Sequence, residues 1–111
     1  MDTIADILRL LAVDTRIEII ESLKAGPMCV CAIARAVGVS QSAVSQHLRL
    51  LKAAGVVTVH RRGQWIHYSL EEKALAAWRT RLSRLCDCNC IRGRRRKGCC
   101  GHTDNKHEKP R

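Results

Sequence analysis

The sequence predicts a mainly α-helical domain that carries one two-stranded β-hairpin. Apolar residues recur at helical spacing up to residue 53, β-branched runs replace this period between residues 56 and 70, and helical spacing returns from residue 72. Gly26, Gly38 and Gly55 stand where successive helical runs stop. Four helices, a hairpin and a final helix are therefore expected in this order.

The first two helices are predicted over residues 2–12 and from a cap at Asp14 or Thr15 to about Lys24, where Gly26-Pro27 ends the second. Their apolar faces should point into the core. These faces consist of Ile4, Ile7, Leu8 and Leu11 in the first helix, and of Ile17, Ile20 and Leu23 in the second.

The next two helices have the pattern of a helix-turn-helix. One is predicted from about Cys29 to Ala36 and ends at Gly38, and the other begins after Ser40, whose hydroxyl can accept from a free backbone N–H of the first turn. Ala34 supplies the small residue of the helix crossing, Gly38 tolerates a positive φ in the turn, and Val44 is the apolar anchor.

The second of these helices has a polar, largely uncharged outer face. Val44, Leu48 and Leu51 share the inner face. Amides and hydroxyls pair with base edges in the major groove, whereas an ordinary solvated helix carries more long charged residues. The alternative is a helical hairpin without a DNA partner. The residues predicted to contact DNA from this helix are Gln41, Ser42, Ser45, Gln46 and Arg49.

Beyond Gly55, two strands are predicted over residues 56–60 and 64–70, with residues 61–63 as the tip. The helix that begins after Ser40 is the expected recognition helix, the one that contacts bases. A two-stranded ribbon that follows such a helix and carries Arg61 and Arg62 is a wing, which can contact phosphates or enter the minor groove. The alternative is a basic hairpin without a partner. With the preceding helices, these features predict a winged helix-turn-helix.

A capping box, Ser69-Leu70-Glu71-Glu72, should open a last helix that runs to about Leu85. We expect its apolar stripe to pack on the first helix and on a second copy of the chain. The expected homodimer would place two recognition helices on a palindromic site in double-stranded DNA. The stripe consists of Leu75, Trp78, Leu82 and Leu85.

Composition divides the 111 residues into a winged domain, 1–90, with dimerising terminal helices, and a flexible basic tail, 91–111, that contains cysteines. The net charge is +10, of which the tail contributes +6, because it holds eight Lys and Arg against two acidic residues. This balance favours a polyanionic partner. We expect no signal peptide or membrane span, a cytoplasmic location, and no enzyme activity, since no nucleophile–base set or phosphate loop is present.

Seven cysteines stand in three clusters: Cys29 and Cys31, then Cys86, Cys88 and Cys90, then Cys99 and Cys100. Closely spaced thiols without an export signal point to metal or redox chemistry rather than to disulfides. For Cys29 and Cys31 the alternative is a role as small apolar packing residues. Alternation with Asp and Asn makes that role less fitting for the second cluster.

Together these segments resemble the ArsR/SmtB family of metal-responsive winged-helix repressors over roughly residues 4–90. The resemblance implies a homodimer that binds operator DNA and releases it when metal binds, with DNA contacts from Gln41, Ser42, Ser45 and Gln46; His47 also matches the family pattern. The matching segments are residues 11–16 (LAVDTR), 28–31 (MCVC), 40–51, 54–57 (AGVV) and 62–68 (RGQWIHY).

The Cys29-Val30-Cys31 segment corresponds to the start of the metal site in arsenite, antimonite, cadmium and lead sensors of that family. As(III) prefers three sulfur ligands, and where the arsenite-sensor pattern has its third Cys this chain has Ala34. The missing donor must come from elsewhere. Either Cys86, Cys88 and Cys90 form a trithiolate site of their own, or they join Cys29 and Cys31.

The expected inducer is As(III) or Sb(III), or another thiophilic ion such as Cd(II) or Pb(II). One alternative keeps the repressor but replaces metal by thiol oxidation or persulfide as its signal. Another class of protein, a carrier of zinc or copper that happens to be basic, would lack sequence-dependent DNA binding.

Overall fold

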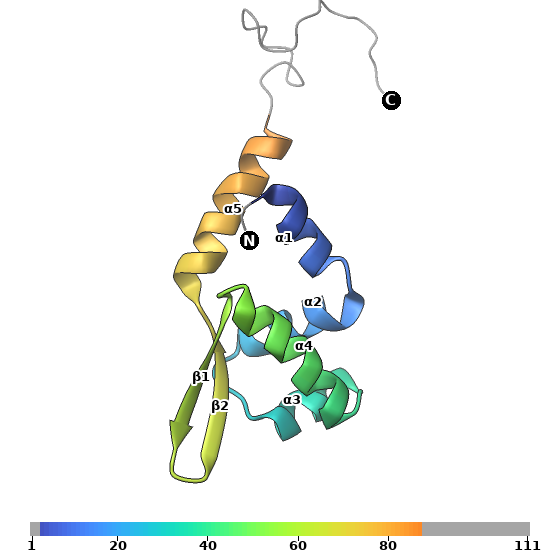
Figure 1. Cartoon of the computed structure of the whole chain (residues 1–111), viewed down its shortest axis with the longest axis vertical. Coiled ribbons are helices and arrows are strands. Elements are labelled where there is room, and N and C mark those ends of the chain that lie inside the picture. The colour runs from blue at the N-terminus through green and yellow to red at the C-terminus, as the bar shows by residue number, and fades with distance from the viewer. Residues whose placement is uncertain (1–2, 88–111) are drawn as a thin grey trace, which may run out of the picture. The chain divides into compact units, whose positions relative to one another are not determined.

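The computed structural model describes residues 3–87 (Figure 1). The chain divides into two compact units, Met1–Arg79 and Thr80–Arg111, and the contacts discussed below lie within the first. The elements confirm the predicted class, five helices and a hairpin in the described part of the chain. They are α1 (Ile4–Leu11), α2 (Asp14–Leu23), α3 (Val30–Val37), α4 (Gln41–Ala53), β1 (Val57–Arg62), β2 (Trp65–Leu70) and α5 (Glu72–Cys86).

The start of α4 is capped as predicted, whereas the cap of α2 is not. The Ser40 hydroxyl accepts a hydrogen bond from the Ala43 N–H at 3.1 Å. Helix α2 has Val13 as its N-cap without a side-chain hydrogen bond, so the predicted cap at Asp14 or Thr15 is wrong. Asp14 is instead the first helical residue, where a carboxylate still interacts favourably with the helix dipole.

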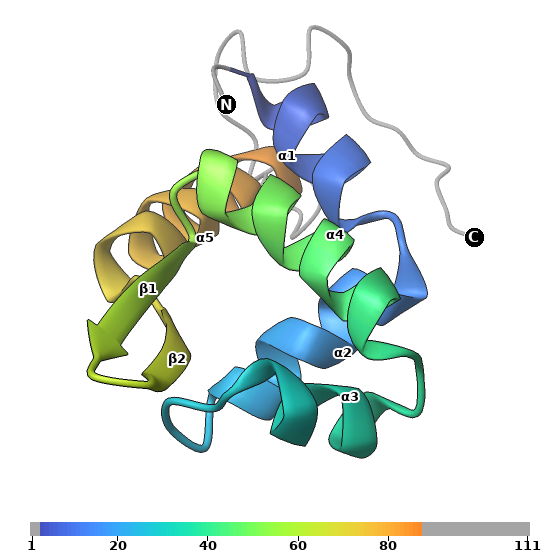
Figure 2. The ribbon, with the colours of Figure 1, turned by 60° about the horizontal axis from the view of Figure 1, so that its bottom comes forward.

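The turn between α3 and α4 has the predicted helix-turn-helix form (Figure 2). Gly38 has φ +83°, a left-handed conformation that glycine adopts without steric cost, and its N–H donates to the Ala34 carbonyl at 2.8 Å. Ala34 and Val44 are both buried, and α3 packs against α4. The roles predicted for these three residues are confirmed.

The core gathers apolar side chains from all five helices and from β1. Two predicted core residues are wrong, since Leu8 is 43% and Ile17 is 41% exposed, while Leu10 and Ile19 are buried instead. Each helix carries apolar residues over a wide part of its circumference. The neighbouring helices decide which of these residues are buried, and the sequence pattern alone does not. The buried residues are Ile7, Leu10, Ile19, Ile20, Leu23, Ile33, Ala34, Val44, Leu48, Leu51, Val56, Val57 and Trp78.

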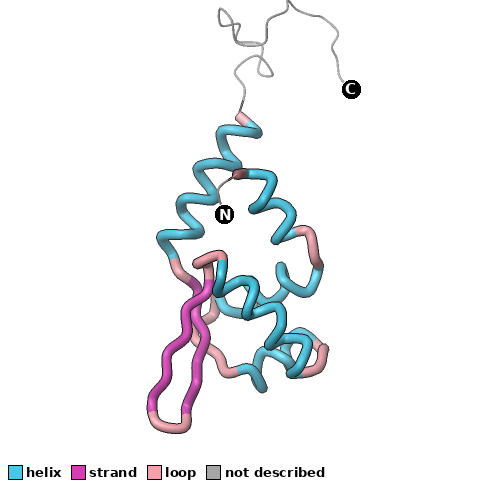
Figure 3. Tube along the Cα trace, viewed as in Figure 1, coloured by secondary structure: helices cyan, strands magenta, loops and turns pink. Residues whose placement is uncertain are grey.

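The hairpin leads from α4 into α5 (Figure 3), and its tip differs from the prediction. Arg61 and Arg62 belong to β1, where they pair with Ile66 and Trp65. The turn consists of residues 63 and 64 only. Gly63, at φ +60°, allows this two-residue turn, whose twist matches that of the paired strands.

The predicted capping box before α5 is wrong. Ser69 lies in β2, and its hydroxyl is 3.0 Å from the Thr58 hydroxyl and 3.2 Å from Nε2 of His60. The hydroxyl is therefore used across the hairpin, and α5 begins only at Glu72. Of the predicted apolar stripe, Trp78 is buried and Leu75 is partly buried, whereas Leu85 is 61% exposed. The packing of the stripe on α1 and on a second copy stays a prediction. The homodimer and the division into residues 1–90 and 91–111 stay predictions.

Candidate nucleic-acid interface and thiol site

Helix α4 presents its polar residues outward because its apolar residues are anchored in the core. Val44, Leu48 and Leu51 are at most 1% exposed. The opposite face offers two amides, two hydroxyls and one guanidinium to a partner. All five residues predicted to contact DNA from this helix are exposed, namely Gln41, Ser42, Ser45, Gln46 and Arg49.

His47 of α4 has an inward role that the sequence did not reveal. Arg16 of α2 donates from Nε to Nδ1 of His47 at 3.2 Å and from Nη1 to the Leu10 carbonyl at 3.0 Å. Burial lowers the pKa of His47, and the charge of Arg16 lowers it further, so the imidazole accepts as a neutral ring. Arg16 thus ties the end of α1 and helix α4 to α2.

Arg61 and Arg62 are exposed but lie on opposite faces of the hairpin, since successive strand residues alternate. Arg62 is paired with Trp65, and Arg61 with Ile66. A duplex beside the wing would meet the two guanidinium groups from different sides. The sequence-based prediction put both arginines in the turn, where no alternation between the two faces of the hairpin was expected.

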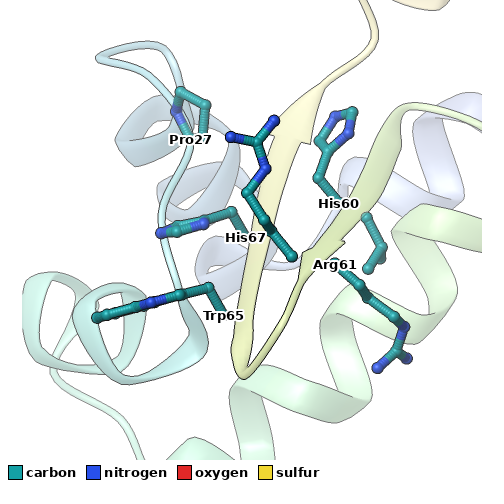
Figure 4. A pocket seen from close by; sticks show the side chains of 7 residues that line it. Pro27, His60, Arg61, Trp65 and His67 are labelled. Carbon is teal, nitrogen blue, oxygen red and sulfur yellow. The ribbon is translucent and has the colours of Figure 1, made fainter.

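A hollow of about 910 Å³ opens beside the wing. Trp65, 65% exposed, stacks on His67 with ring centroids 6.0 Å apart and planes 7° from parallel. Figure 4 shows both rings extending from β2 to the side on which Pro27 lies. The side chains around the hollow include no carboxylate. They belong to Pro27, Val59, His60, Arg61, Arg62, Trp65 and His67.

Cys29 stands at the start of the helix-turn-helix, directly after the residue that pairs with the wing. It is the partly buried N-cap of α3, and the preceding residue, Met28, forms an antiparallel bridge with Tyr68 of β2. The Met28 N–H donates to the Tyr68 carbonyl at 3.0 Å, and the Tyr68 N–H donates to the Met28 carbonyl at 2.8 Å. The sequence contains no short-range signal for this pairing.

The other predicted metal ligands are only partly described. Cys31 is exposed, and Nη2 of Arg35 donates to its sulfur at 3.1 Å. Cys86 is exposed at the end of α5, in the second unit, while Cys88 and Cys90 lie outside the described residues. Within residues 3–87, no group of three His, Cys, Asp or Glu side chains is arranged to hold a metal ion. Likewise, no helix of this part is long and apolar enough to cross a membrane.

The fold and the exposed face of α4 define a winged helix-turn-helix domain. Residues 14–59 match the family model described as bacterial regulatory protein, arsR family. A solved structure titled as a possible transcriptional regulator for arsenical resistance has 33% sequence identity and a TM-score of 0.68, and the match covers 77% of this chain and 88% of that one. The chain belongs to the ArsR family, which confirms the resemblance and a regulatory rather than enzymatic class.

Two curated relatives are similar over a shorter part of their length. The HTH-type transcriptional repressor SmtB of Mycobacterium tuberculosis is 43% identical over 76 residues, which are 68% of this chain and 56% of that protein. The arsenical resistance operon repressor of Escherichia coli is 35% identical over 75 residues, 67% of this chain and 63% of that protein. The match therefore spans less than two thirds of each relative.

Proposed function

We propose that the chain is a transcriptional repressor that binds a palindromic operator as a homodimer and releases it when a thiophilic ion binds. The observation that carries this proposal is the outer face of α4, where five exposed polar side chains stand on a helix held by three buried ones. Amides, hydroxyls and an arginine on the exposed face of one helix suit the edges of bases in the major groove.

The two DNA-contacting elements have different tasks in this proposal. Helix α4 reads bases through Gln41, Ser42, Ser45 and Gln46, and Arg49 adds a charge to the same face. The wing arginines bind phosphates and position the protein without reading sequence. A net charge of +10 supports this through the release of counterions.

We expect a homodimer because the exposed face of a single α4 is too small to contact a whole palindromic site. One α4 can read only one half-site, whereas a two-fold dimer places two such helices about 34 Å apart, one turn of DNA. Leu8 supports a contact between copies, because it is an apolar side chain of α1 left 43% exposed.

The inducer is proposed to bind the cysteines, with As(III) or Sb(III) preferred and Cd(II) or Pb(II) as other thiophilic candidates. The name of the E. coli relative, an arsenical resistance operon repressor, supports this choice. Cys29 and Cys31 start α3, and Cys86, Cys88 and Cys90 are the further thiols of the proposal. Because α3 packs against α4, an ion at Cys29 acts on the helix that positions the reading helix. Induction requires the ion to bind the DNA-free arrangement more tightly.

The test measures binding of the reduced protein to DNA from its own promoter region by fluorescence anisotropy. Arsenite, antimonite, cadmium or lead should release the operator, while a scrambled duplex should bind weakly throughout. Equal affinity for operator and scrambled DNA would exclude a sequence-reading repressor.

A thiol-redox repressor is the second candidate, and the exposed Cys31 beside Arg35 favours it. If metal ions leave the complex intact while peroxide or persulfide dissociates it and dithiothreitol restores it, the signal is oxidation rather than metal.

A further inference from the structure

The thiol pair at the start of α3 lacks a third donor in its own segment. The position three residues beyond Cys31 holds Ala34, which is buried and has no donor atom in its side chain. Two thiolates do not complete the coordination shell of a soft or borderline ion. An ion held by Cys29 and Cys31 must therefore draw in another side chain.

The bridge between Met28 and Tyr68 brings such a side chain close. In an antiparallel pair, the residue after one partner lies opposite the residue before the other. The bridge between Met28 and Tyr68 therefore implies that Cys29 lies opposite His67. The backbone of Cys29 is still extended, at φ −84° and ψ 164°. Opposite residues have Cβ atoms about 5 Å apart and point to the same face.

The face shared by Cys29 and His67 is the outer one. Met28 and Tyr68 are both partly buried against the core, and neighbours along a strand point to opposite sides. His67 accordingly extends away from the core, beside Trp65 and toward the side of Pro27 (Figure 4). One face therefore carries a thiol of α3 and an imidazole of the wing.

His67 is also available as a ligand. Within residues 3–87, neither of its ring nitrogens makes a hydrogen bond, and its ring contact is the stack with Trp65. His60, its partner across the hairpin, is engaged instead, with Nε2 3.2 Å from the Ser69 hydroxyl and 3.4 Å from that of Thr58. His60 is thus a matched control on the same ribbon.

We propose that His67 is the third protein donor, with Cys29 and Cys31, of an ion site that joins α3 to the wing. The proposal rests on the thiol site of the proposed function. Since the described residues are not yet arranged as a metal site, His67 must turn from Trp65 toward Cys29 when the ion binds. Two sulfurs and one imidazole nitrogen suit Cd(II), which is one of the thiophilic ions of the proposed function and accepts mixed sulfur and nitrogen ligands.

An ion bound at this site would contact both the helix-turn-helix and the wing, the two elements that are expected to bind DNA. Cys29 and Cys31 belong to the first helix of the helix-turn-helix, and His67 lies in the strand that pairs with Arg61 and Arg62. Closing the site changes the angle of the wing relative to α4. The duplex then cannot contact both at once.

The test uses the full-length chain with Cys86, Cys88, Cys90, Cys99 and Cys100 replaced by Ser, so that only the first thiol pair remains. Cd(II) is titrated and followed by cadmium–thiolate absorbance, by Trp65 fluorescence and by the ¹⁵N resonances of the His67 ring. We expect His67→Gln to weaken Cd(II) binding about tenfold or more, equivalent to at least about 1.4 kcal/mol, and His60→Gln to leave it unchanged. Trp65→Phe identifies the emission change that belongs to Trp65.

Equal Cd(II) affinity in His67→Gln and His60→Gln, or ring nitrogens of His67 that do not shift, would overturn the proposal. So would a parent protein that binds no Cd(II). The proposed function is judged separately, from release of operator DNA by the unmodified protein, so either can fail while the other stands. Thermal unfolding of each variant verifies that it is folded.

Discussion

Nε of Arg16 donates to Nδ1 of His47 over 3.2 Å, and this single hydrogen bond links α2 to the helix that we expect to read DNA. The same guanidinium holds the Leu10 carbonyl at 3.0 Å. Because His47 accepts through one nitrogen, the bond requires a neutral imidazole. This hydrogen bond therefore adds to the apolar anchor of α4 through a side chain that is itself partly buried.

Replacing Arg16 with Ala should destabilise the fold by about 1–3 kcal/mol, because His47 and the Leu10 carbonyl both lose their donor in a partly buried site. Denaturant unfolding measures this loss. Operator affinity should fall while the preference for operator over scrambled DNA is kept, since Arg16 contacts no base. Arg9→Ala, which removes only an exposed ion pair, is the control and should change stability little.

Stability should decrease as the pH falls below about 6.5. The pKa of His47 is lowered in the folded protein, so the unfolded chain takes up a proton first and is favoured as the pH falls. The loss starts near the ordinary histidine pKa and levels off below the lowered pKa of the folded state. Urea unfolding of wild type and His47→Gln between pH 8 and 5 measures it, and an identical pH dependence in the two proteins would exclude this assignment.

Gly38→Ala should cost about 1–2 kcal/mol of stability through backbone strain alone. Gly38 has φ +83°, and a Cβ atom added there meets nothing within 4 Å, so no clash contributes. Gly38→Asn should cost less, because Asn tolerates the left-handed region better. Thermal unfolding ranks the two variants, and a larger loss in Asn than in Ala would show that another effect dominates.

Base-reading and phosphate-binding residues should respond differently to substitution. Gln41→Ala or Ser45→Ala should reduce discrimination between operators by about 1–3 kcal/mol. Arg61→Ala or Arg62→Ala should weaken binding to every DNA sequence and should lower the slope of log affinity against log salt concentration by about one each. Anisotropy titrations at several salt concentrations separate these effects. Because the two arginines lie on opposite faces, unequal losses are expected between them. Uniform losses on specific and random DNA for all four would refute the division of roles.

Substituting thiols should abolish induction and leave DNA binding intact. Cys29→Ser, and separately Cys88→Ser with Cys90→Ser, should bind operator with wild-type affinity but fail to release it with arsenite or cadmium, because each removes soft donors. Release is followed by anisotropy under reducing conditions. Cys99→Ser with Cys100→Ser is the comparison; a response lost only in that variant would move the sensor to the last cluster.

The local part of this structure could be predicted from the sequence. The helix-turn-helix follows from Ser40, Gly38 and the apolar spacing of α4, because caps, turns and helical faces depend on neighbours a few residues apart. The change to β-branched residues predicts the hairpin for the same reason. Cys29 and Cys31 stand out as candidate ligands through their spacing alone.

Residues distant in sequence decided the rest. The capping box at Ser69 was wrong because the Thr58 and His60 side chains, across the hairpin, use its hydroxyl. The prediction that Leu8 lies in the core was wrong, because a wide apolar arc on a helix does not show which of its residues the neighbouring helices will cover.

The amino-acid sequence by itself determined the class of the protein, the polar face of α4 and the thiols that could sense an ion. Only the tertiary structure decided that Arg16 holds His47, and that Met28 pairs with Tyr68 and so brings Cys29 beside the wing. Propensities and periodicity act over a few residues, whereas these contacts join segments 31 to 40 positions apart and exist only once the core has packed.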